Sequence, residues 1–277
     1  MSATYEGFEL FKVEKKEQIV TITLDNQEYA NALTWRHNIE MKEIFWRLKQ
    51  DGDTRAVIWR SEGEHFSTVF PGAPIHPVMK PPVHPLNGLE LAGPDITQDL
   101  QHHMSFLKML LEVPQPFIVL LHGLATGFAL NMALNCDFII AADDTIMNDQ
   151  HTPKGMCCGD GGAIIWPLIL GPQKAKQYLF TGDNMTAEEA ERFGMVTKVV
   201  PRAELDQYGW DLAKRLTAMP TMAIRFTKHA INRTIEHTMG YTWEFADAMQ
   251  ILSCFTDDYN EMKQANKEKR PPVLKGR

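Results

Sequence analysis

The sequence predicts an α/β fold followed by a helical C-terminal region. Over residues 1–201, short apolar runs typical of buried strands alternate with longer stretches of helical periodicity. From about residue 202 the strand-like runs cease, and amphipathic helical patterns fill residues 202–277. The 277 residues are 44% hydrophobic and 23% charged, a balance typical of a globular chain with a large core. We therefore divide the chain into an α/β core and a helical C-terminal region.

The first elements follow from local patterns. Residues 18–24 alternate as a strand does, a helix opens near Thr34 and runs to about Gln50, and residues 56–60 indicate a second strand. Residues 71–94 then hold seven of the sixteen prolines, which excludes a regular helix there. Such an insertion is either a lid or binding loop, or a disordered segment.

The later elements are also predicted from local sequence patterns. Strands at residues 117–121 and 138–142 bracket a helix at about 126–135. Thr186 and Glu189 form a capping box that opens a short helix, and Gly194 is placed to end it. The C-terminal helices are expected over the ranges 205–219 and 221 to about 257.

Charge and cysteine content exclude several classes of protein. The net charge of −7 and pI near 5.8 argue against a nucleic-acid partner. The four cysteines form no CxxC pair, which favours reduced thiols and a cytoplasmic location. The N-terminus carries no apolar signal segment, and no apolar run approaches about 18 residues. We expect neither secretion nor a membrane partner.

One glycine-rich loop carries a candidate acid–base pair. His151 is followed by Asp160 nine residues later, with Gly155, Gly159 and Gly161 giving the backbone freedom to turn back. Histidine is the side chain whose ordinary pKa lies closest to neutrality, and a nearby aspartate can orient its ring. The two residues are a candidate base and its orienting group. The alternative is a surface histidine near an Asp-Gly turn.

Other histidines do not indicate a metal site. His102, His103 and His122 lack the HxxxH or HExxH spacing, and adjacent histidines on a helix point in different directions. We expect no metal and no cofactor.

Several short motifs occur together in the order and spacing of the crotonase (enoyl-CoA hydratase/isomerase) superfamily, which this chain resembles over about residues 8–230. The motifs lie at residues 31–33, 123–137, 161–162, 179–182 and 186–190. The resemblance implies a crotonase-like spiral of ββα units, a helical C-terminal trimerisation region and a reaction through an enolate held by two backbone N–H groups. It implies self-association as a trimer or a dimer of trimers.

The resemblance also assigns individual positions. The two N–H donors of the oxyanion hole would be those of Phe70 and Phe128, and an amide at a helix start suits that role because it lies at the positive end of the helix dipole. Alternatively, these two phenylalanines are simple core aromatics. The two glutamates that hydratases of this superfamily use fall on Asn131 and His151, and Asn131 cannot exchange a proton near pH 7.

Within this superfamily, the chain is most similar to the β-diketone hydrolase branch that includes 6-oxocamphor hydrolase. The shared features are the pattern from His151 to Gly161, Trp166-Pro167, residues 178–182 and Glu244. The resemblance implies that His151, Asp160 and Glu244 are catalytic, although Glu244 could equally be a solvated helix carboxylate. Asn131, His37 and Trp166 are the candidate substrate-binding residues. The branch has histidines where this chain has Phe128 and, near the first helix, Asn38 beside His37.

The first functional hypothesis is therefore a carbon–carbon bond hydrolase that acts on a small carbonyl substrate, a β-diketone, by a retro-Claisen reaction. His151 would deprotonate water, hydroxide would add to one carbonyl, and the tetrahedral oxyanion would expel the enolate of the other. The alternatives are an enoyl-CoA hydratase, isomerase or lyase acting on a CoA thioester, and a non-catalytic protein of the same fold.

Overall fold

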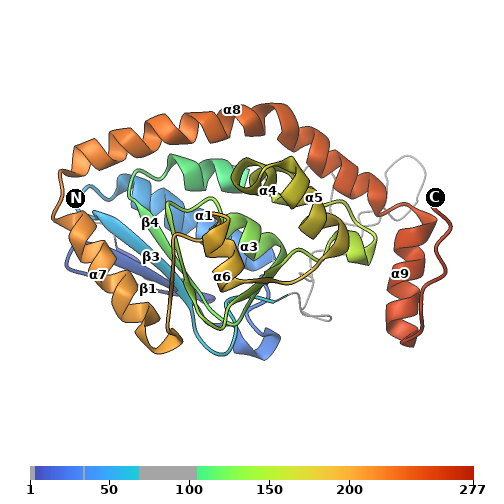
Figure 1. Ribbon diagram of the computed structural model, residues 1–277. Helices are drawn as coiled ribbons and strands as arrows, with labels where there is room; N and C mark the ends of the chain where they lie inside the picture. The colour runs from blue at the N-terminus through green and yellow to red at the C-terminus, as the bar shows by residue number, and fades with distance from the viewer. Residues whose placement is uncertain (1–3, 34, 69–104) are drawn as a thin grey trace.

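The computed structural model describes residues 4–33, 35–68 and 105–277, and in this part of the chain the main sheet has six strands (Figure 1). Their order is β1-β2-β3-β4-β6-β9. Their bounds are β1 Phe11–Lys16, β2 Ile19–Leu24, β3 Ala56–Ser61, β4 Phe117–Leu121, β6 Phe138–Ala142 and β9 Lys198–Val200. β1 and β2 pair antiparallel, whereas every later neighbour is parallel. Parallel neighbours require crossover connections, which helices supply here.

Both faces of this sheet are buried, because alternate residues of each strand pack into different cores. In β3, Ala56 and Ile58 pack with α7 (Leu205–Thr217), while Val57 and Trp59 belong to the larger core on the other face. Gly209 lets α7 approach closely, since a Cβ there would lie 2.7 Å from a methyl group of Leu120. The strands are therefore nearly continuous apolar runs.

A second, smaller sheet brings together the segments that carry the candidate site. It consists of β5 (Leu124–Thr126), β7 (Ile146–Asn148) and β8 (Met185–Thr186). β5 runs directly into α3, and β7 runs directly into the loop of His151. Because β5 and β7 are parallel neighbours, these two exits lie at the same edge. Before the C-terminal region, the helices of the described residues are α1 Trp35–Gln50, a helix at residues 105–112, α3 Gly127–Ala133, α4 Gly162–Leu170, α5 Pro172–Thr181 and α6 Ala187–Arg192. The 3₁₀ turns are η1 Gln27–Tyr29, η2 Thr152–Lys154 and η3 Arg202–Glu204.

The chain after β9 is helical, and its longest element is α8 (Thr221–Ser253), which crosses the top of the molecule in Figure 1. Lys228 and Asn232 fasten α8 to the core through backbone carbonyl groups. The helix expected from residue 221 to about 257 is found as α8, four residues shorter at its end, whereas the helix that follows it was not predicted. α8 ends at Ser253, and α9 (Asp257–Glu268) begins after the Thr256 hydroxyl, which accepts the N–H of Tyr259 at 3.1 Å.

Several local predictions are confirmed. The strands at 117–121 and 138–142 have the expected bounds, and the Thr186–Glu189 capping box forms with both of its hydrogen bonds. β1 was not predicted, since three of its six residues are lysine. The proline-rich segment 71–94 lies outside the described residues.

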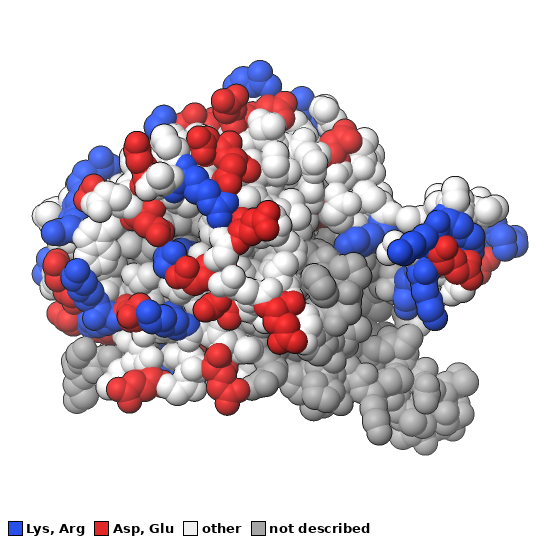
Figure 2. Space-filling model, turned by 90° about the horizontal axis from the view of Figure 1, so that it is seen from below, with Lys and Arg blue, Asp and Glu red and all other residues white. Residues whose placement is uncertain are grey.

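The surface and the helices also bear on the expected partners. Figure 2 shows Lys and Arg interspersed with Asp and Glu over one face, with basic side chains gathered on the lobe that contains α9 and the C-terminal tail. Of the helices that the structure describes, none combines the length and apolar character that crossing a bilayer requires. Cys136, Cys157, Cys158 and Cys254 are free thiols.

Candidate active site

His151 lies at the centre of a buried polar network. It follows β7 and directly precedes the short turn η2, whereas Asp160 lies in the turn before α4. Nε2 of His151 lies 3.1 Å from Oδ2 of Asp160, so the structure brings together the two residues that the loop pattern singled out. The Nδ1 atom lies 2.7 Å from Oδ1 of Asp149, a residue that was not predicted for the site. Both ring nitrogens of His151 are thus paired with carboxylates.

Asn131 links the two carboxylates. Its side-chain amide donates to Oδ2 of Asp149 at 3.1 Å and to Oδ1 of Asp160 at 2.9 Å. Its own oxygen accepts the indole N–H of Trp166 at 3.0 Å. Both amide hydrogens and the carbonyl oxygen are therefore in use, which fixes the orientation of the Asn131 side chain. A glutamate in this place would bring a third carboxylate against two others.

The electrostatic balance favours a charged histidine. Burial alone would lower the pKa of His151, but the two carboxylates outweigh burial and hold the pKa well above its ordinary value of 6.5. Burial would likewise raise the pKa of Asp149, but hydrogen bonds from His151 and Asn131 outweigh it and lower that pKa to about 2. We therefore describe His151 as an imidazolium at neutral pH.

Exposure separates the roles of the two carboxylates. The Asp149 side chain is fully buried, whereas the side chains of His151 and Asp160 are 12% and 5% exposed. Only the latter two have any surface with which to meet another molecule. Asp149 is suited to hold the imidazole in place from its buried side and to keep it protonated.

Glycines allow the network to close. Gly161 has φ +126°, a conformation that favours glycine, and a Cβ there would lie 3.4 Å from both the Asn131 Cβ and the ring tip of Trp243. A Cβ on Gly162 would lie 2.9 Å from a carboxylate oxygen of Asp149. The start of α4 therefore approaches the network more closely than a chain with side chains at these positions could.

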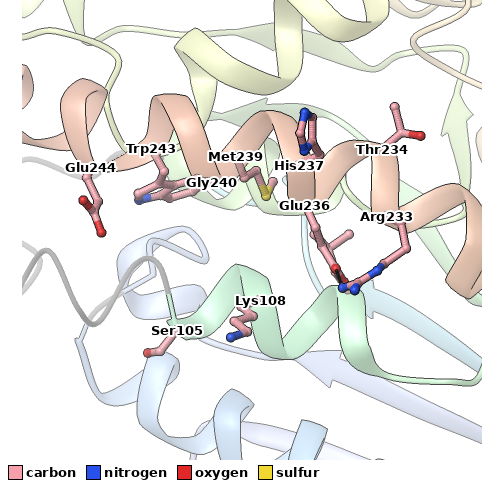
Figure 3. Close-up of a pocket in the computed structure, with 11 residues that line it drawn as sticks. Ser105, Lys108, Arg233, Thr234, Glu236, His237, Met239, Gly240, Trp243 and Glu244 are labelled. Carbon is pink, nitrogen blue, oxygen red and sulfur yellow. Dashed lines mark hydrogen bonds and ion pairs between the residues drawn. The ribbon is translucent and has the colours of Figure 1, made fainter.

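An open groove lies on the other side of Trp243. It is bounded by α8 and by the helix at residues 105–112, and its volume is about 1110 Å³. Figure 3 shows Trp243 and Glu244 pointing from α8 toward the helix that carries Ser105 and Lys108. The Trp243 side chain thus lines the groove and also faces the Gly161 turn beside the network.

The remaining residues that were predicted for the site lie on several different elements. Phe128 is the second residue of α3, three residues before Asn131, and its half-buried ring packs on Phe106 with centroids 5.9 Å apart. Glu244 is exposed at the groove. His37 is buried on α1 and packs edge-on against Phe11, 5.6 Å between ring centroids. Phe70 lies outside the described residues.

Asp149 and Trp243 were not predicted from the sequence. Asp149 stands two residues before His151, and its carboxylate also accepts the His151 backbone N–H at 3.0 Å. An Asp-x-His step directly after a strand was the available signal. Trp243 had none, because its contact with the Gly161 turn depends on how α8 crosses the core.

Of the histidines weighed as metal ligands, His122 is the one that lies in the described part of the chain, and it stands apart from this network. His122 is buried directly after β4, beside other charged groups. His102 and His103 lie outside the described residues.

Comparisons with known proteins agree with the observed architecture. A family model described as enoyl-CoA hydratase/isomerase matches residues 87–277. The carnitinyl-CoA dehydratase of Citrobacter koseri is 29% identical, covering 94% of this chain and 95% of its own. The crystal structure of an enoyl-CoA hydratase from Bacillus anthracis has a TM-score of 0.70 at 27% identity, covering 97% of this chain and all of that one. An enoyl-CoA hydratase from Mycobacterium avium subsp. paratuberculosis reaches a TM-score of 0.81 at 19% identity, a likeness of fold alone, with 97% and 100% coverage. The fold class predicted from the sequence is confirmed.

Proposed function

Because this chain belongs to the enoyl-CoA hydratase/isomerase family, we propose that it is an enzyme that transfers protons on a CoA thioester, with Asp160 and His151 as the acid–base unit. The observation that carries the proposal is the buried contact of His151 with both Asp149 and Asp160. A CoA thioester as substrate is supported by the similarity to a carnitinyl-CoA dehydratase and an enoyl-CoA hydratase. The choice of Asp160 and His151 is supported by their contact.

The proposed chemistry follows from the charges. With His151 protonated, the three groups carry one net negative charge, and the Asp160 carboxylate accepts a proton from the carbon chain of the thioester. The imidazolium stays paired with Asp149 throughout, so the unit becomes neutral as the substrate becomes an enolate. The N–H groups of Phe128 and Phe70 are the proposed donors to the enolate oxygen, Phe128 because it lies in the first turn of α3.

A double-bond shift fits these residues better than hydration does. Hydration by two separate carboxylates requires a second group that exchanges protons, and Asn131 cannot do so. Its amide is instead occupied in holding Asp149 and Asp160. One acid–base unit is sufficient to remove a proton from one carbon and return it to another. We therefore favour an isomerase-type reaction.

The groove is the proposed site of the acyl chain. Its apolar lining includes Leu111, Met239 and Trp243, and Lys108 offers a positive charge. Glu244 is proposed to contact substrate or water from this side. Roles for His37 and Trp166 in substrate binding stay predictions, with Trp166 acting through Asn131.

The test is proton exchange in deuterated water. We expect the purified protein to interconvert short-chain 2-enoyl- and 3-enoyl-CoA and to incorporate deuterium, as followed by mass spectrometry. Asp160→Asn should lower the rate by about 10²–10⁴-fold, because the amide cannot accept the proton. Asp183→Asn removes an exposed carboxylate and should leave the rate unchanged. A rate in Asp160→Asn equal to that of the unaltered protein would overturn the proposal.

Cleavage of a β-diketone is the second candidate, and the contact between His151 Nε2 and Asp160 favours it because that reaction needs an oriented histidine. The raised pKa of His151 opposes it, since a base must first lose its proton. Loss of diketone absorbance together with no exchange on any CoA thioester would select this second function.

A further inference from the structure

A buried thiol lies beside the network and takes no part in the proposed proton transfer. Sγ of Cys158, a carboxylate oxygen of Asp149 and a ring nitrogen of His151 all lie within 4.8 Å of one another. Cys158 is 5% exposed and Asp149 is 1% exposed, so the cluster is shielded from bulk water. Thiolate, imidazole and carboxylate are the three side-chain ligands that Zn²⁺ uses most.

We propose that Asp149, His151 and Cys158 bind a zinc-like divalent cation, with Nδ1 as the histidine ligand. Nδ1 and Oδ1 of Asp149 now share a hydrogen bond of 2.7 Å. Zinc bonds of roughly 2.0–2.3 Å in a tetrahedron place ligand atoms about 3.3–3.8 Å apart. The cation thus requires these two atoms to separate by about 0.6 Å and the sulfur to approach by up to about 1 Å, shifts that side-chain rotation can supply.

The groups around the three ligands are already arranged as zinc sites require. Metal-bound imidazoles usually donate their second N–H to a carboxylate, and Nε2 of His151 faces Asp160 at 3.1 Å. Ligating carboxylates are usually hydrogen-bonded in turn, and the second oxygen of Asp149 accepts the Asn131 amide at 3.1 Å. These two contacts are independent of the distances among the ligands.

The fourth position of the tetrahedron is available to water or to Thr152, whose hydroxyl oxygen lies 3.5 Å from the Cys158 sulfur. Binding replaces the proton on Nδ1 and the proton on the thiol, and both pass to solvent. No oxidation or reduction is involved. The occupant is therefore a redox-inert cation of the zinc type, and Co²⁺ is its spectroscopic substitute.

The experiment is a Co²⁺ titration of the full-length protein without substrate. We expect one equivalent to produce tetrahedral visible bands and a near-ultraviolet thiolate-to-cobalt band, and Zn²⁺ to displace both. Cys158→Ser should abolish the thiolate band, and Asp149→Asn should weaken Co²⁺ binding at least 10-fold. Cys157→Ser is the matched control, because its thiol is the neighbour in sequence but lies outside the cluster.

Two results would overturn the inference. One is no thiolate band in the unaltered protein, and the other is a band that survives in Cys158→Ser but disappears in Cys157→Ser. Circular dichroism of each variant checks that it is folded, and Asp149→Asn gives a second variant should Cys158→Ser misfold.

The binding measurement stands apart from the proposed function because it uses no substrate. Cobalt binding without proton exchange on thioesters would support the metal site and refute the proposed function. Proton exchange without cobalt binding would support the proposed function and refute the metal site. If the proposed function holds, Zn²⁺ inhibits exchange in the unaltered protein and in Cys157→Ser, but not in Cys158→Ser, because the cation replaces the Nδ1 proton of His151 and breaks its pairing with Asp149.

Discussion

At the scale of single residues, the centre of the molecule is a histidine held between two carboxylates. Asp149 lies 2.7 Å from one ring nitrogen and Asp160 lies 3.1 Å from the other. Two buried carboxylates repel each other, and the amide of Asn131 offsets this by donating to both. The arrangement keeps a proton on the ring and leaves one carboxylate, Asp160, partly accessible.

The charge of His151 can be measured directly. We expect the His151 pKa to lie well above 6.5, and Asp149→Asn to lower it because one of the two negative charges is lost. Nuclear magnetic resonance titration of the imidazole ring protons reports this value. Asp143→Asn, which removes an exposed carboxylate elsewhere, should leave it unchanged. An ordinary histidine pKa in the unaltered protein would contradict the charge assignment.

The same pKa shifts set how this network stabilises the fold at different pH. Folding raises the pKa of His151, so its contribution is complete below pH 6.5 and is lost as the pH rises through the higher folded-state pKa. Folding lowers the pKa of Asp149 from 3.8 to about 2, so its contribution is present above pH 3.8 and is lost as the pH falls through about 2. Both contributions are therefore fully present between pH 3.8 and pH 6.5.

At the scale of elements, α8 is held to the core by buried polar contacts as well as by packing. Lys228 is 8% exposed, and its ammonium group donates to Asp137 at 2.7 Å and to the carbonyl oxygen of Gln115 at 2.8 Å. One turn later, Asn232 donates to the carbonyl oxygen of Leu111 at 2.9 Å. These contacts fix the line along which α8 crosses the core and thereby place Trp243 against the Gly161 turn.

Removing this cation should destabilise the protein. We expect Lys228→Met to lower the free energy of unfolding by about 2–4 kcal/mol, because the Gln115 carbonyl loses its donor and the Asp137 carboxylate loses its counter-charge, keeping the Phe117 N–H. Lys214→Met on the exposed side of α7 should change it by less than about 0.5 kcal/mol. Urea denaturation at one protein concentration compares each variant with the unaltered protein. Equal denaturation midpoints for Lys228→Met and the unaltered protein would show that the contact adds nothing to stability.

At the scale of the whole molecule, α8 carries large apolar side chains on its outer side that the single chain does not cover. Each of the following is at least half exposed: Met222, Phe226, Ile231, Tyr241, Phe245 and Leu252. A soluble monomer rarely leaves so many large apolar side chains along one helix in water. We therefore retain the prediction that copies of this chain associate through the C-terminal region as a trimer or a dimer of trimers.

Light scattering coupled to size-exclusion chromatography tests the association. We expect the mass of three or six chains of 31.5 kDa, and Phe226→Glu combined with Phe245→Glu should shift it toward the monomer, because charges would be buried at the interface. Trp46→Glu places the same charge on α1 as a control. A monomeric mass for the unaltered protein would rule out the prediction.

Much of the architecture could be predicted because it depends on local physics. The strand at 117–121 is an uninterrupted apolar run, and the helix after Thr186 begins where a hydroxyl and a carboxylate satisfy two amides. The helix α9 was not predicted, and the local signal that marks its start is Thr256, whose hydroxyl caps the first turn. β1 was missed because its alternate residues are charged and face solvent.

The sequence by itself determined the fold class and most of the elements, and it singled out His151 and Asp160 as a candidate pair because a glycine-rich loop can turn back on itself. The contact between them was decided by the tertiary structure. Tertiary structure alone decided the rest of the network. Asp149 and Asn131 join it because the parallel pairing of β5 and β7 brings their exits to one edge. Trp243 and the Cys158 cluster depend on the crossing of α8 and the turn before α4. The contacts of Asn131 and Trp243 join residues far apart along the chain, and no local pattern encodes them, whereas Asp149 lies only two residues before His151.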